Sequence, residues 1–163
     1  MPTPTPTPTP TTLNETVLKN AHPEVRAWLA AFVERNGGFV GSVHLSGPAA
    51  TEGEIVLVAA HNLPPSVQNG TAVIPVGKGM AGTAAERRAP VAVSDFQTDT
   101  TGVAVPGGRA ARAKGSLTLP VFDPADDTRL LAVVGLGFTE TRDFTEAEIA
   151  AYGADAATVL KAV

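Results

Sequence analysis

The sequence predicts an α+β fold in which five or six strands form one antiparallel sheet, with helices at both ends of the chain and one in the middle. Strand-like and helix-like segments do not alternate, which argues against a parallel sheet built from βαβ units. Residues 115–122 and 130–138 are apolar segments joined by a short polar turn, which predicts an antiparallel hairpin. The continuous apolar run at 130–134 predicts a central strand that is covered on both faces.

Two helices are predicted at the start of the chain. Thr12 and Glu15 have the spacing of a capping box, which favours a short helix through Asn20. A second helix is predicted over residues 23–36, because apolar residues recur there on one helical face. These residues are Val25, Trp28, Leu29, Phe32 and Val33. The Gly37-Gly38 pair after Asn36 is a typical helix end.

The middle of the chain combines short strands with a glycine-rich turn. Strands are predicted over residues 39–45, 55–61, 72–76 and 91–93. Gly77, Gly79 and Gly82 favour a tight turn and close backbone approach at the start of a helix over residues 79–88. The free N–H groups at such a helix start can receive an anion or a polar ligand. The alternative is a tight turn with nothing bound, since the spacing matches neither a dinucleotide fingerprint nor a P-loop.

The last predicted helix covers residues 145–163. Thr145 and Glu148 form a capping box, and an apolar stripe follows. The stripe consists of Ile149, Tyr152, Ala156, Val159, Leu160 and Val163. Before it, residues 97–112 have the composition of a long loop, with a strong breaker at Pro106-Gly107-Gly108.

Composition predicts a single cytoplasmic domain at residues 13–163, after a Thr/Pro-rich tail or linker at residues 1–12. The net charge of −4 argues against direct nucleic-acid binding. No apolar run is long enough to span a membrane, and no signal peptide is visible. The absence of cysteine excludes disulfides, zinc–thiolate sites and thiol nucleophiles from these residues.

No catalytic or metal-binding constellation is visible. The three histidines, His22, His44 and His61, share no metal-ligand spacing and pair with no serine and carboxylate. Aspartates near position 123 lie in a predicted hairpin turn, where this residue type commonly bonds its own backbone. We therefore predict no catalytic residue, no metal and no certain cofactor.

Residues 72–97, "AVIPVGKGMAGTAAERRAPVAVSDFQ", resemble the middle of a GAF domain, the ligand-sensing module of many signalling proteins. "GSLTLPVFD" and "RDFTEAEIAAYGADAATVLKAV" are similar to the last third of that family. The resemblance implies terminal helices on one face of the sheet, with a pocket helix and loops on the other. It also implies which chemistries are missing. Without cysteine, these residues can neither reduce methionine sulfoxide through thiols nor attach a bilin, and the cyclic-nucleotide pattern is absent. Only His61 or His44 is available as a haem ligand.

The resemblance implies a ligand pocket under the helix at 79–88 and the loop at 97–112. Its expected wall is Met80, Ala81, Phe96, Ser116 and Thr118, with His61 as a further member. Half of the twelve basic residues lie between positions 78 and 114. Arg109 and Arg112 are expected to reach an anionic ligand there. The alternative is a solvated positive face.

The functional prediction is a non-enzymatic sensor that binds an unidentified small molecule, with an anion as one candidate. It would transmit binding through a homodimer of its terminal helices or through a downstream signalling protein. The alternative is a ligand-free module for dimerisation or protein docking. An enzyme on this fold is the third and least favoured interpretation.

Overall fold

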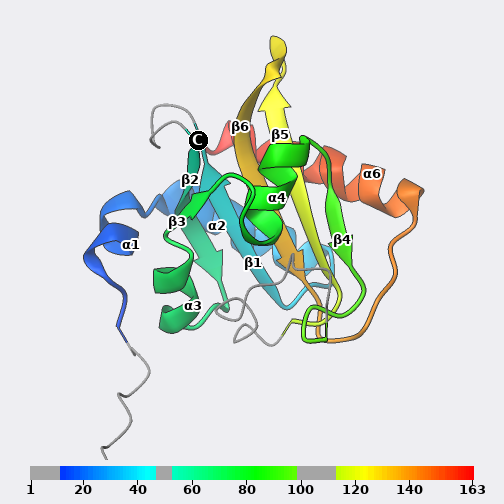
Figure 1. Cartoon of the computed structure of the whole chain (residues 1–163), viewed down its shortest axis with the longest axis horizontal. Helices are drawn as coiled ribbons and strands as arrows, with labels where there is room; N and C mark the ends of the chain where they lie inside the picture. Colours follow the sequence, from blue (N-terminus) through cyan, green and yellow to red (C-terminus); the bar gives the residue numbers. More distant parts are fainter. Residues whose placement is uncertain (1–11, 47–52, 99–112) are drawn as a thin grey trace, which may run out of the picture.

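The computed structural model describes residues 12–46, 53–98 and 113–163, and these form one curved antiparallel sheet with helices on both faces (Figure 1). The sheet has six strands in the order β3-β2-β1-β6-β5-β4. The strands are β1 Val40–Leu45, β2 Glu54–His61, β3 Val73–Pro75, β4 Val91–Val93, β5 Ser116–Asp123 and β6 Asp126–Gly137. Every neighbouring pair is antiparallel, so the predicted fold class is confirmed.

The helices divide between the two faces of the sheet. They are α1 Glu15–Asn20, α2 Pro23–Arg35, α3 Pro65–Gly70, α4 Gly79–Arg87, α6 Glu146–Ala156 and the 3₁₀ helix η2 Ala157–Lys161. Helices α2 and α6 cover one face, α4 covers the other, and α1 and α3 lie at the β2–β3 edge (Figure 1). This is the predicted arrangement of terminal helices and central helix.

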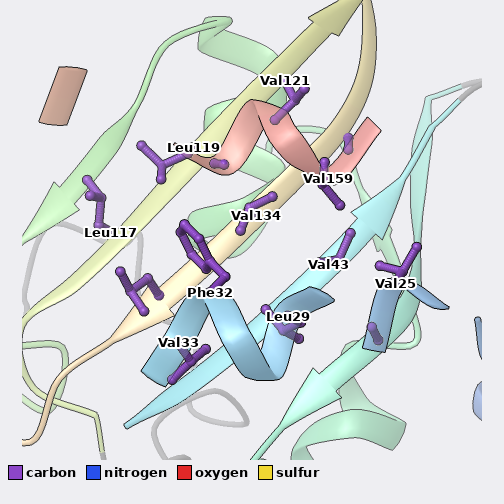
Figure 2. Close-up of a cluster of buried hydrophobic side chains, with 14 of the residues drawn as sticks. Val25, Leu29, Phe32, Val33, Val43, Leu117, Leu119, Val121, Val134 and Val159 are labelled. Carbon is purple, nitrogen blue, oxygen red and sulfur yellow. The ribbon is translucent and has the colours of Figure 1, made fainter. Parts of the chain in front are cut away.

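The larger hydrophobic core lies between α2, α6 and the sheet. Figure 2 shows Leu29 and Phe32 of α2 pointing at Val43 of β1 and Val134 of β6. The apolar stripe of α2 therefore faces the strands, as its spacing predicts. Trp28 stacks on Phe32 at 4.9 Å between ring centroids, and its indole N–H donates to the Thr158 hydroxyl at 2.8 Å. This bond ties α2 to the C-terminal helices.

A smaller core lies between α4 and the opposite face of the sheet. Ala84 and Met80 of α4 pack there against Ile55 and Val133. Val133 and Val134 are neighbours on β6, so their side chains enter different cores. The prediction that β6 is a central strand covered on both faces is thus confirmed.

Local turn and cap signals were partly right. The capping box of Thr145 and Glu148 is present, with both reciprocal hydrogen bonds. Asp123 accepts the Ala125 N–H at 2.9 Å, which confirms that aspartate shapes this hairpin turn. The first helix, however, is capped by Asn14 rather than Thr12, because the Asn14 side chain accepts from Val17 N–H.

Two further boundaries differ from the sequence prediction. The α-helical part of the C-terminal segment ends at Ala156 and continues as η2, rather than running to Val163. Helix α3 was missed, because Pro64-Pro65 indicates a turn, although proline at the first helical position also starts helices. Among the described residues, no helix has the length and apolar character needed to cross a membrane.

Candidate functional site

A depression opens on the α4 side of the sheet, over the start of β1, the start of β5 and the end of β6, with a volume of about 100 Å³. We call it the β6 depression. It is lined by Val40, Gly41, Ser42, Leu63, Met80, Phe96, Ala113, Ser116, Leu117, Thr118, Gly135, Leu136 and Gly137. Its floor is the C-terminal end of β6, a strand that is paired on both sides by β1 and β5.

Strand register brings three hydroxyl groups around two glycines. Gly135 of β6 lies between Ser42 of β1 and Thr118 of β5. Two residues along, Gly137 lies beside Ser116 in the same way. Residues two apart on a strand point to the same face, so these side chains share the α4 side. The result is a bare backbone floor with hydroxyl groups on its flanks.

The floor exists because β6 carries glycine at both positions. A Cβ atom at Gly135 would stand 2.6 Å from the Ser42 hydroxyl, and one at Gly137 would stand 2.8 Å from the Cβ of Ala113. Any larger residue would therefore fill the space. Glycine inside a strand is typical of sites where a ligand or another backbone approaches closely.

The three hydroxyls differ in how far they are already engaged. The Thr118 hydroxyl donates to the backbone carbonyl of Met80 at 3.3 Å, which holds the first turn of α4 over the sheet. The Ser116 hydroxyl donates to the carbonyl of Lys114 at 3.2 Å. Within the described part of the chain, the half-buried Ser42 hydroxyl makes no hydrogen bond. It is therefore the hydroxyl best placed to bond a ligand.

Met80 and Phe96 form the apolar upper wall. Both side chains are almost completely buried, with 8% and 9% exposed. The backbone N–H of Phe96 donates to the backbone carbonyl of Lys114 at 2.7 Å, which fixes the position of Phe96. No charged side chain is among the described residues of this lining. The described wall thus favours a largely apolar, uncharged group.

Four of the residues predicted from the sequence come together in this depression, namely Met80, Phe96, Ser116 and Thr118. Ala81 instead packs against the smaller core, and the half-buried His61 at the end of β2 does not line the depression. Arg109 and Arg112 lie outside the described residues, as does most of the predicted loop.

Sequence reasoning missed Ser42, Gly135 and Gly137. The Gly-Leu-Gly string within a predicted strand was the available signal, because strand glycines are unusual without close approach. Ser42 carried no local signal. Its role follows only from the β1–β6 register.

The glycine motif at 77–82 has a packing role in this structure. A Cβ atom at Gly82 would stand 2.6 Å from the carbonyl oxygen of Pro75, and the Gly77 N–H donates to the Gly82 carbonyl at 2.7 Å. Gly77 and Gly79 both have positive φ, which favours glycine. The motif therefore seats α4 directly on the end of β3. Only Met80 of the helix start reaches the β6 depression.

The described basic residues near α4 lie away from the depression. Arg88 donates to the carbonyl of Asp127 at 2.7 Å, and its guanidinium sits 4.7 Å from the ring centroid of Phe122. Lys78 and Lys114 are exposed and do not line the depression. None of these three groups supplies charge to the depression.

His44 is the one buried side-chain group in the described residues that lacks a hydrogen-bond partner, at its Nδ1 atom. Its Nε2–H donates to the carbonyl of Thr71 at 2.9 Å. Burial lowers the pKa of His44 to about 4, and the bond to Thr71 offsets part of that effect. The described residues contain no group of three or more His, Asp or Glu able to hold a metal ion.

Comparison with known proteins identifies the fold. A sequence model of the GAF domain matches residues 11–159. No curated protein matches the chain significantly. The GAF domain of a phosphoenolpyruvate-protein phosphotransferase from Coxiella burnetii matches with a TM-score of 0.62 and 21% identity, covering 89% of this chain and 88% of that chain. The second GAF domain of DevS from Mycobacterium smegmatis matches with a TM-score of 0.59 and 20% identity, covering 86% of this chain and 90% of that chain.

The prediction that this protein is not an enzyme is contradicted by a third match. The type II free methionine-R-sulfoxide reductase of Thermoplasma acidophilum has a TM-score of 0.63 at 13% identity, covering 88% of this chain and 94% of that chain. That protein is an enzyme, so the same fold supports catalysis as well as sensing. At these identities each likeness shows the fold alone.

Proposed function

The chain belongs to the GAF domain family, and we propose that it is a sensor domain that binds a small molecule in the β6 depression. The family commonly serves in sensing and signalling. The observation that supports a ligand here is the bare floor at Gly135 and Gly137, flanked by the unengaged hydroxyl of Ser42. A volume of about 100 Å³ corresponds to roughly three water molecules. The bound group is therefore small, with an apolar face toward Met80 and Phe96 and a hydrogen-bonding group toward Ser42.

Gly135→Ala tests this proposal, because the added methyl group occupies the floor of the depression. The only atom it crowds is the Ser42 hydroxyl, which can rotate away, so the fold should be retained. A small-metabolite screen by thermal shift on the wild type should find a stabilising compound, worth about 2.7 kcal/mol at 100 times its dissociation constant. Gly135→Ala should bind that compound at least tenfold more weakly.

Gly70→Ala is the matched control, since a Cβ atom there meets nothing within 4 Å. It should bind the compound as the wild type does. A compound that binds Gly135→Ala unchanged would place its site elsewhere. A screen with no hit, together with no metabolite released on denaturation, would favour the ligand-free module for dimerisation or docking.

An anionic ligand remains a prediction that depends on Arg109 and Arg112. The described lining is neutral, so this prediction rests on these two residues, which lie outside the described part of the chain. The double variant Arg109→Ala, Arg112→Ala should weaken binding of an anionic hit by about 1.5–3 kcal/mol. Unchanged binding would leave the basic residues as a solvated surface.

We further propose that the domain spans residues 13–163, acts in the cytoplasm and signals through a homodimer or a downstream signalling protein. The proposed dimer contact is the outer side of α2 and the C-terminal helices. Leu160 is only half-buried there, and Val163 is 58% exposed. Sedimentation should show a dimer at high micromolar concentration, and Leu160→Glu should shift it toward monomer. A wild-type protein that stays monomeric would exclude this dimer.

A further inference from the structure

A second and larger cavity lies beside β2, between this strand and helices α1 and α2. We call it the α1 cavity. Its volume is about 450 Å³, which falls within the usual range of small-molecule sites, roughly 300–1,000 Å³. Its walls are mainly apolar, with Val17 and Leu18 of α1, Ala27 and Ala30 of α2, and Leu57 and Ala60 of β2. Its lining shares no residue with the proposed sensor site.

Helix α1 covers the cavity, and hydrogen bonds anchor the residues before and after it. Asn69 of α3 accepts the Asn14 N–H at 2.7 Å and donates to the Thr12 carbonyl at 2.9 Å. After the helix, the His22 N–H donates to the Val58 carbonyl at 2.8 Å. Val17 of α1 is buried, although Leu18 is 60% exposed. Helix α1 is too short to be stable alone. These anchors therefore preform the cavity.

The polar groups of the cavity favour a negative charge. Arg26 is the only charged residue of its described lining, and its guanidinium makes no hydrogen bond or ion pair within the described part of the chain. His22 also lines the cavity, and its Nδ1 accepts the Val25 N–H. In the neutral ring the proton is then on Nε2, which adds a second donor. Two donors and no carboxylate suit an anion.

We propose that the α1 cavity binds an amphipathic carboxylate, with its alkyl chain against Val17, Ala30 and Leu57 and its carboxylate at Arg26. The apolar walls explain the need for a chain, and the unpaired guanidinium explains the need for a charged end. This site is separate from the β6 depression. If the sensor proposal fails, this proposal is unaffected.

A series of straight-chain carboxylates tests the proposal by titration calorimetry on the full chain. Butanoate, hexanoate and octanoate should bind with increasing affinity, by about three- to fourfold for each methylene group that enters the cavity. Octanol should bind at least tenfold more weakly than octanoate, because it lacks the charge that Arg26 pairs with. Affinity that does not depend on chain length, or no binding of octanoate, would overturn the proposal.

Two pairs of variants locate the octanoate site. Ala30→Leu fills the cavity and should weaken octanoate binding at least tenfold, while Ala31→Leu, exposed and outside the lining, should not. Arg26→Gln should weaken octanoate binding at least tenfold and leave octanol binding unchanged. Arg26→Lys should bind octanoate more tightly than Arg26→Gln does. Arg26 is exposed, so this pair remains informative if Ala30→Leu fails to fold. Equal binding by Arg26→Gln and the wild type would exclude Arg26 as the anion partner. Gly135→Ala, which changes the β6 depression, should bind octanoate as the wild type does, and a loss of binding would overturn the placement of octanoate in the α1 cavity.

Discussion

Lowering the pH from 7 to 4 should cost the folded protein about 3 kcal/mol through His44 alone. Its imidazole has a pKa of about 4 in the folded state and about 6.5 in the unfolded chain. Between pH 4 and pH 6.5, His44 is mostly protonated in the unfolded chain but mostly neutral in the folded protein. The contribution of His44 is therefore complete above about pH 6.5 and is lost as the pH falls toward 4. Each unit of pKa difference corresponds to about 1.36 kcal/mol.

His44→Gln separates this effect from other acid-sensitive groups. The Gln side chain can keep a donor toward the Thr71 carbonyl but does not titrate. Urea unfolding at several pH values should show a loss between pH 7 and 4 that is about 3 kcal/mol smaller in the variant than in the wild type. Asp155, whose pKa is lowered mainly by its hydrogen bond from Arg35, is present in both proteins and cancels. Equal pH dependence, or a His44 imidazole that titrates by NMR near 6.5, would contradict the assignment.

Gly82→Ala should destabilise the protein by about 2 kcal/mol, even though alanine is the better helix former. The added Cβ atom would stand 2.6 Å from the carbonyl oxygen of Pro75. That oxygen belongs to the backbone of β3, so relief requires α4 to move away from the sheet. Overpacking of this kind costs about 3 kcal/mol at the upper end of its usual range. The gain in helix propensity is about 1 kcal/mol.

Gly70→Ala is again the control, since it also adds a methyl group to a helix but meets open space. Its free energy of unfolding should equal or exceed that of the wild type, and Gly82→Ala should fall below both. A displaced α4 would also move Met80 at the β6 depression, so ligand binding should weaken together with stability. If Gly82→Ala proves as stable as Gly70→Ala, the close seating of α4 on β3 is incorrect.

The parts of the fold that local sequence could predict are those decided by neighbouring residues. The capping box of Thr145 and Glu148 depends on residues three apart, and the apolar face of α2 on a helical repeat, so both were visible. The cap at Asn14 was missed because Thr12 offered an equally good spacing. In the structure Asn69, which lies far along the chain, accepts the Asn14 N–H and donates to the Thr12 carbonyl, and local sequence does not show these contacts.

The candidate site was only partly predictable for the same reason. Met80, Phe96, Ser116 and Thr118 were predicted together, as the wall of the pocket that the family resemblance implies. Ser42 becomes part of the site only because β1 pairs with β6 in a register that sets it beside Gly135. A shift of one residue would have turned it to the other face. The glycines at 77–82 could be recognised as a motif in the sequence, but the close approach of Gly82 to the Pro75 carbonyl could not be predicted from it.

The β1–β2 register places Ser42 directly opposite Ala60. Ser42 lines the β6 depression and Ala60 lines the α1 cavity, so this cross-strand pair borders both sites. Under the two binding proposals, a molecule that shifts this pair at one site would change the room at the other. Free-energy conservation makes such an influence mutual: whatever factor an octanoate-like compound imposes on the sensor ligand, the sensor ligand imposes on octanoate. If both proposed ligands bind, each would therefore change the affinity of the domain for the other by the same factor.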